Sequence, residues 1–216
     1  MTFPSPSSAQ AVVAVSGLSR RFGSSTALDD VSVFVPGGSV LGLVGENGAG
    51  KTTLIKHLLG MLKAQSGAVR VFGLDPVRDP VGVLSRVGYL SERRDLPGWM
   101  RVDEFIRYTR AFYPSWDEDY AKRLQEQFQL DPAQKIKTLS QGQQAKAGLL
   151  TSLAYRPDLL ILDEPSSAWT PSFAGTFWRR SFAWWRKKVG PLCSRLTSWM
   201  KSNGWPTTSS CCSADA

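Results

Sequence analysis

The residues best suited to chemistry form one glycine-rich run, which fits the pattern G-x-x-x-x-G-K-[ST]. In such a run the glycines let successive backbone amides turn inward around phosphate oxygens. The ammonium of Lys51 is expected to reach the β- and γ-phosphates of a nucleotide, and the hydroxyl of Thr52 is expected to ligate Mg²⁺. The candidate phosphate-binding residues are Gly45, Glu46, Asn47, Gly48, Ala49, Gly50, Lys51, Thr52 and Thr53.

Two acids, Asp163 and Glu164, follow the short apolar run Leu159-Leu160-Ile161-Leu162. Alone, the pair would be interpreted as the solvated end of a strand. Downstream of a phosphate loop, it predicts the second half of a phosphoryl-transfer site. Asp163 would then hold Mg²⁺, and Glu164 would orient or deprotonate the attacking water.

A third motif, Leu139-Ser140-Gln141-Gly142-Gln143, opens a predicted helix that is rich in small and apolar residues. The Ser140 hydroxyl and the Gly142 amide would lie at the positive end of the helix dipole, where an anion is favoured. An ordinary helix cap at Ser140 explains the same residues. The motif by itself leaves both interpretations open.

The elements that must position these motifs indicate an α/β fold: a P-loop NTPase core with a helical subdomain over about residues 93–155. An apolar strand over 39–44 should precede the phosphate loop, and a helix over 53–60 should follow it. The only histidine, His57, lies on that helix and is predicted to be on the surface. Other strands are predicted at 11–15, 27–35, 68–72, 87–90 and 159–162, and a largely helical stretch at 102–155.

The three motifs in this order resemble the ATP-binding subunit of an ABC transporter, over about residues 12–167. The resemblance implies that two such subunits, here a homodimer, sandwich two ATP molecules with Mg²⁺. Ser140 and Gly142 would contact the γ-phosphate held by the other subunit. Gln141 stands where the family usually has Gly. Integral membrane subunits would carry the transported substrate, so the resemblance places the protein in the cytoplasm, on the inner face of the plasma membrane.

The resemblance also assigns roles to two residues outside these motifs. Phe22 occupies the position of an aromatic that stacks on adenine, although plain core packing is an equal alternative. Glu92 stands where the family usually has Gln, a metal-side residue. The apolar residues Leu96, Trp99 and Met100 follow it. They predict either a groove for a helix of the membrane subunit or a small satellite core.

The composition places the excess charge at one end of the chain. The net charge is +8, but the 26 basic and 18 acidic residues leave 19 and 17 before Ala168. Residues 168–216 therefore allow an alternative function, nucleic-acid binding through Arg, Lys and Trp. All three cysteines lie there too, and with one histidine in the chain they predict neither a disulfide framework nor a zinc site. Residues 1–10 are Ser- and Pro-rich and are predicted to be disordered.

The resemblance stops after Ser167, where Ala168-Trp169-Thr170-Pro171 replaces the family's Gly-Leu-Asp-Pro. A Trp codon followed by a Thr codon always contains GAC, an Asp codon, in a neighbouring frame. The same shift permits a switch-histidine segment over 197–207. We interpret residues 168–216 as the product of a single-base frameshift that truncates the domain. The chain therefore lacks the family's switch histidine and its coupling Asp, which is the Asp of Gly-Leu-Asp-Pro and couples the two ATP sites. Without these two residues, we expect nucleotide binding with slow or absent hydrolysis. A divergent tail is the alternative.

Overall fold

The computed structural model describes residues 11–39, 41, 43, 46, 48–91 and 95–163. The chain divides into two compact units. Unit 1 comprises residues 1–78 and 170–216, and unit 2 comprises residues 79–169. The predicted disorder of residues 1–10 and the interpretation of the tail from 168 onward lie outside the described residues.

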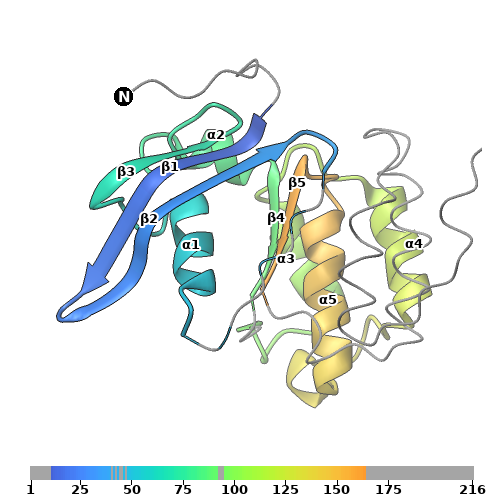
Figure 1. The fold of residues 1–216 in the computed structure, drawn as a ribbon. Helices are drawn as coiled ribbons and strands as arrows, with labels where there is room; N and C mark the ends of the chain where they lie inside the picture. The colour runs from blue at the N-terminus through green and yellow to red at the C-terminus, as the bar shows by residue number, and fades with distance from the viewer. Residues whose placement is uncertain are drawn as a thin grey trace, which may run out of the picture. The chain divides into compact units, whose positions relative to one another are not determined.

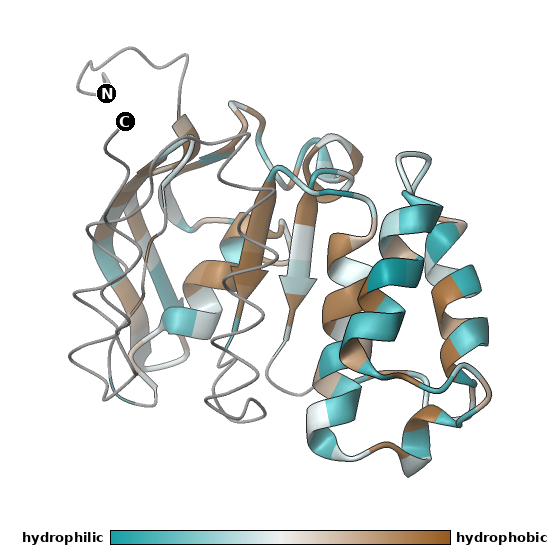
Figure 2. Cartoon of the chain, turned by 90° about the vertical axis from the view of Figure 1, so that its right-hand side faces the viewer, coloured by the Kyte–Doolittle hydropathy of each residue, from teal (hydrophilic) through white to brown (hydrophobic). Residues whose placement is uncertain are grey.

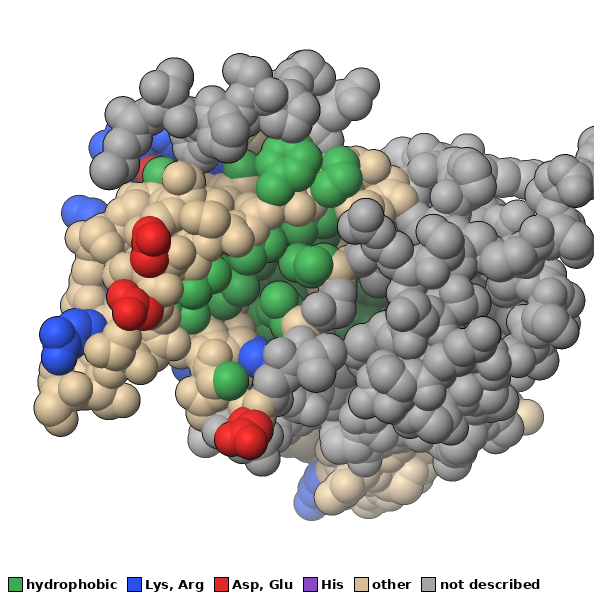
Figure 3. Space-filling model, in the orientation of Figure 1, with side chains coloured by type: hydrophobic (Ala, Val, Ile, Leu, Met, Phe, Trp, Pro, Cys, Tyr) green, Lys and Arg blue, Asp and Glu red, His purple; other side chains and the backbone are tan. Residues whose placement is uncertain are grey.

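Unit 1 is built on a three-stranded antiparallel sheet of β1 (Ala11–Phe22), β2 (Ser25–Pro36) and β3 (Ser66–Val71), in the order β2-β1-β3. Apolar side chains of β1 alternate into the core, among them Val13 and Val15. β1 turns into β2 through Gly23, whose φ of +57° suits a tight hairpin (Figure 1). In the space-filling view, hydrophobic side chains gather on the face of the molecule toward the viewer (Figure 3).

One helix of unit 1, α1 (Lys51–Leu58), contacts both β2 and β3. Its buried face includes Leu54, Leu58 and His57, which is only 1% exposed. The prediction that His57 lies on the surface is therefore wrong. Its position, three residues after Leu54, puts the imidazole on the apolar stripe. The ring is held there because Nδ1 donates a hydrogen bond to Thr53 O at 2.8 Å.

Unit 2 combines a two-stranded parallel sheet with helices. The strands β4 (Val87–Leu90) and β5 (Leu159–Leu162) pair residue for residue from Val87 with Leu159 to Leu90 with Leu162. The helices are α2 (Pro80–Leu84), α3 (Val102–Arg110), α4 (Glu118–Phe128), the 3₁₀ turn η2 (Ile136–Thr138) and α5 (Gln141–Leu153).

The longest described helix, α5, packs against β4 at two glycines. A Cβ on Gly88 would lie 2.5 Å from Ser152 O, and a Cβ on Gly148 would lie 3.0 Å from Leu90 Cδ1. The two glycines thus permit an approach that larger residues would prevent. Figure 2 shows the strands of unit 2 apolar along most of their length, whereas its helices carry polar and apolar stripes. This is the pattern of helices covering a buried sheet.

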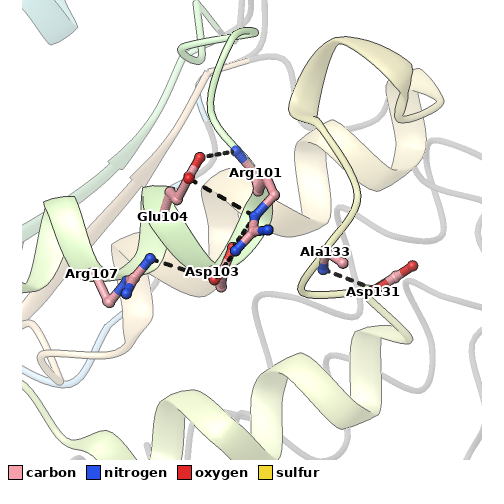
Figure 4. A network of polar contacts seen from close by, with 6 residues as sticks. All are labelled: Arg101, Asp103, Glu104, Arg107, Asp131 and Ala133. Carbon is pink, nitrogen blue, oxygen red and sulfur yellow. Dashed lines mark hydrogen bonds and ion pairs between the residues drawn. The ribbon is translucent and has the colours of Figure 1, made fainter.

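The N-terminus of α3 is organised by exposed charges (Figure 4). The Arg101 guanidinium donates to both carboxylate oxygens of Asp103, at 3.1 and 3.0 Å, and Glu104 accepts from the Arg101 amide at 2.8 Å. The hydrogen bond from Arg101 lowers the pKa of Asp103 below its ordinary value. These acids are satisfied within their own turn, so the cluster is a structural cap rather than a catalytic pair.

Most of the predicted elements are confirmed. The strands at 87–90 and 159–162 have the predicted bounds, whereas β1 extends to Phe22, well past the predicted end at Val15. The short helix α2 was not predicted, because its five residues are too few for a periodic pattern. The predicted strand at 39–44 includes residues 40, 42 and 44, which lie outside the described residues. Within the described residues, no helix is long and apolar enough to cross a membrane.

Candidate functional site

The phosphate loop in unit 1 bends around the carbonyl of Glu46. The Ala49 amide donates to this oxygen at 3.1 Å, and Lys51 Nζ donates to it at 3.0 Å. The lysine side chain thus returns across the loop instead of extending into solvent. This arrangement holds a positive charge beside the bend. The predicted contact of Lys51 with the phosphates of a nucleotide stays a prediction.

The helix that follows, α1, begins without the usual side-chain cap. Its N-cap is Gly50, in the left-handed conformation with φ +83°, which makes no side-chain cap hydrogen bond. Its first turn contains no acidic residue. Thr52 and Thr53 lie in this turn and are partly buried. The positive end of the helix dipole thus has neither a cap from Gly50 nor an acidic residue in its own first turn, a start that suits an external phosphate.

Two glycines of the loop, Gly48 and Gly50, have positive φ but differ in the space around their Cα atoms. A Cβ on Gly50 would collide with the carbonyl oxygen of Ala27 and approach Leu28 Cδ2 to 2.9 Å, so only glycine fits. Gly48, with φ +88°, has open space around the same position. The end of the loop therefore lies directly against β2.

The aromatic residue Phe22 ends β1 and pairs with Ser25 across the hairpin. Its side chain is 46% exposed, so the alternative of plain core packing does not describe it. Ser25 is two residues from Ala27, or about 7 Å along a strand. Phe22 thus lies on the same part of unit 1 as the phosphate loop, and its ring is accessible.

The helix α5 in unit 2, which follows the Leu139-Ser140-Gln141-Gly142-Gln143 motif, starts at Ser140 with a reciprocal cap. Ser140 Oγ accepts from the Gln143 amide at 3.2 Å, and Gln143 Oε1 accepts from the Ser140 amide at 2.9 Å. The cap predicted as the plain alternative is therefore present. Gly142 is the second residue of the helix, where an amide has no partner within the helix. The cap and the predicted anion site are compatible, because they use different amides.

The acid Asp163 immediately follows β5, and its amide donates to Leu90 O at 2.9 Å, which extends the pairing with β4. The residue is only 5% exposed. Burial, together with the Asp163 charge, raises the pKa of Tyr89 above its ordinary value. The carboxylate is thus fixed at the carboxyl end of a buried strand, as predicted.

The residues proposed for a groove separate by environment. Trp99 is 72% exposed, whereas Met100 is 7% exposed and belongs to the core of unit 2. Leu96 is intermediate. Met100 therefore fits the satellite core, and only Trp99 presents a large apolar surface to a partner.

Four predicted site residues, Gly45, Asn47, Glu92 and Glu164, lie outside the described residues. Unit 1 contains the described residues of the loop, Thr52, Thr53 and Phe22, and unit 2 contains Ser140, Gly142 and Asp163. No group of three or more His, Cys, Asp or Glu gathers in the described part of the chain. The metal set, which contains one hydroxyl, therefore stays a prediction.

One residue that bears on this site, Arg20, was missed. Its guanidinium carbon lies 4.7 Å from the centroid of the Phe22 ring. A signal was available, because residues two apart on a strand share a face. The short predicted strand at 11–15 concealed it.

Comparison with known proteins supports the same assignment. The model of the ABC transporter family matches residues 28–167, or about two thirds of the chain. The chain belongs to the ABC transporter family. The family match ends at the residue after which the sequence departs from the family pattern.

Individual relatives agree with this membership. The chain is 30% identical over 168 residues to the uncharacterized ABC transporter ATP-binding protein YdbJ of Bacillus subtilis, covering 76% of this chain and 54% of that one. It is 33% identical over 162 residues to the uncharacterized ABC transporter ATP-binding protein MJ1023 of Methanocaldococcus jannaschii, covering 72% and 56%. The chain thus spans about half the length of these relatives. A solved ATP-binding subunit of an ABC transporter superposes with a TM-score of 0.69 at 26% identity, covering 79% and 73%.

Proposed function

We propose that this chain binds ATP with Mg²⁺ as the nucleotide-binding subunit of an ABC transporter. The observation that carries the proposal is the start of α1, where Gly50 provides no side-chain cap and Lys51 lies in the first turn. The family match over residues 28–167 supports the proposal. A triphosphate would accept hydrogen bonds from the loop amides and from Lys51. Gly45 and Asn47 would complete the loop.

Magnesium would be held by Thr52, by Asp163 through water, and by Glu92. The oxygen chemistry of this set suits the ion, which prefers hydroxyl, carboxylate and water ligands. Asp163 is buried directly after β5, so its carboxylate is positioned by the end of a strand. When bound, Mg²⁺ neutralises charge on the phosphates.

Hydrolysis would depend on Glu164 as the group that orients or deprotonates water. We expect it to be slow or absent, because Ala168-Trp169-Thr170-Pro171 replaces the segment with the coupling Asp. A frameshift accounts for this replacement. The nucleotide sequence of the gene through codon 167 tests the frameshift. If no reading frame downstream encodes the missing segment, the frameshift is ruled out.

The partners proposed are a second copy of the chain and integral membrane subunits, at the inner face of the plasma membrane. In the dimer, Ser140 and Gly142 would contact the nucleotide of the other copy. Trp99 is the exposed apolar residue best suited to touch a membrane subunit. Nucleic-acid binding by residues 168–216 is the second candidate, and it rests on their charge alone.

Calorimetric titration of the full chain with Mg·ATP tests the binding proposal. Lys51→Ala should weaken binding about 10- to 100-fold, because a hydrogen bond to a charged group contributes ~1.5–3 kcal/mol. Lys56→Ala is the matched control, because Lys56 is an exposed lysine on the same helix. Equal affinity of parent and Lys51→Ala would contradict the proposal. Phosphate release compared with Glu164→Gln separates slow hydrolysis from none.

A further inference from the structure

The aromatic ring of Phe22 has a cation on one of its faces. The guanidinium carbon of Arg20 lies 4.7 Å from the ring centroid, within the ~6 Å range of a cation–π contact. Phe22 is nevertheless 46% exposed. A ring that is covered on one side and open to that extent has a face left for a flat ligand.

The guanidinium is anchored independently of the ring. Arg20 Nη1 donates to Lys63 O at 3.2 Å, in the segment that follows α1. Arg20 Nε is buried and has no hydrogen-bond partner among the described residues. Burying a guanidinium nitrogen without a hydrogen-bond partner is unfavourable. The contact of Arg20 with the ring is therefore kept despite this local cost in free energy.

The strand beneath the ring is also fixed, although β3 no longer pairs with it. The last pairing of β1 with β3 is Ser19 with Ser66. Beyond it, the side-chain amide of Gln65 takes the place of a strand: Oε1 accepts from the Arg21 amide at 2.7 Å, and Nε2 donates to Arg21 O at 3.2 Å. The backbone between Arg20 and Phe22 is therefore held at the tip of the sheet.

We propose that Arg20 is a positioning residue for a purine base, with its guanidinium holding one face of Phe22 so that the other face stacks on the base. This inference rests on the proposed nucleotide site. The cation also draws electron density from the ring, which favours stacking on an electron-rich purine. In this proposal Arg20 acts through the Phe22 ring and not on the phosphates, so its effect should be confined to ligands that carry a base.

The test compares two ligands, Mg·ATP and Mg·tripolyphosphate, by titration calorimetry of the full chain. Arg20→Met keeps the length of the side chain and removes its charge. It should weaken ATP binding about two- to fivefold, the range of an exposed cation–π contact, and leave tripolyphosphate binding unchanged. Arg20→Lys should restore most of the ATP affinity. In a Phe22→Leu background, Arg20→Met should have no further effect.

Each other outcome has one meaning. Equal weakening for both ligands would show that Arg20 acts on the phosphate loop or on the fold, and would overturn the inference, as would unchanged affinity for both. An effect that persists in Phe22→Leu would also overturn it. If the parent chain binds neither ligand, or Lys51→Ala binds both as well as the parent, the nucleotide site itself fails and the inference fails with it.

Discussion

The helices α1 and α5 begin in opposite ways, although the sequence predicts an anion site at both. The first amides of α1 follow Gly50, which has no side chain to cap them. Those of α5 follow Ser140, whose hydroxyl already accepts from the third residue. A helix start that caps itself is stable without a ligand, whereas an uncapped one gains from an external anion. The comparison therefore predicts that the loop before α1 contributes more to phosphate affinity than the turn before α5.

A third helix, α4, extends this range beyond α5. Its cap is Asp117, which accepts from the Tyr120 amide at 2.8 Å and from Arg156 Nε at 2.7 Å. Here the helix dipole meets a carboxylate that belongs to the chain. The three helix starts thus range from no side-chain cap at α1, through a hydroxyl at α5, to a carboxylate at α4. Substitutions at each start can therefore separate effects on ligand binding from effects on stability.

The largest effect is expected at the uncapped start. Gly50→Ala should lower the free energy of unfolding by ~3 kcal/mol, because the left-handed backbone and the collision with Ala27 O both oppose a methyl group. Urea unfolding measures it. Gly48→Ala is the matched control, with the same hand of backbone but open space, and should cost only ~1 kcal/mol. Similar losses for both variants would mean that the loop does not pack on β2 as described.

The next effect is expected at Asp117. Asp117→Ala should cost ~1–2 kcal/mol at pH 7, from the lost cap and the lost charged partner of Arg156. The hydrogen bond from the Tyr120 amide is the main cause that lowers the pKa of Asp117 in the folded chain. A lowered pKa contributes stability above the unfolded value of about 3.9, and this contribution is lost as the pH falls through the folded value.

Urea unfolding at several pH values tests this sign. The difference between parent and Asp117→Ala should be constant from pH 5 to 7 and should shrink below about pH 4. Asp117→Asn keeps a good cap and removes the titration, so it should lie between them at pH 7. A difference that grows on acidification would contradict the assignment.

The sequence predicted most of the regular elements, because apolar runs such as 159–162 and 87–90 have a simple pattern. It also predicted the cap at Ser140, which is present, whereas phosphate binding by the loop and by the Ser140 turn stays a prediction. The burial of His57 was predicted wrongly because histidine is polar, although its spacing from Leu54 places it on the apolar face of α1. The contact of Arg20 with Phe22 was missed because the strand was predicted to end at Val15, so the shared strand face of the two residues was not recognised.

The smallest effect is expected at the self-capped start, and it decides the comparison most directly. Ser140→Ala removes the acceptor for the Gln143 amide and should lower the free energy of unfolding by ~1 kcal/mol. It should leave the Mg·ATP affinity of a single chain unchanged, because this turn would act only on a nucleotide held by a second copy. Ser140→Asp keeps an acceptor and should restore the stability.

These two readouts separate the roles of the hydroxyl. A loss of stability that Ser140→Asp repairs, with unchanged affinity in dilute protein, assigns the hydroxyl to the cap. An affinity loss that appears only at protein concentrations where two copies associate assigns it also to the partner's nucleotide. An affinity loss in the dilute single chain would break the comparison, because the self-capped start would then contribute to the same phosphates as the uncapped one.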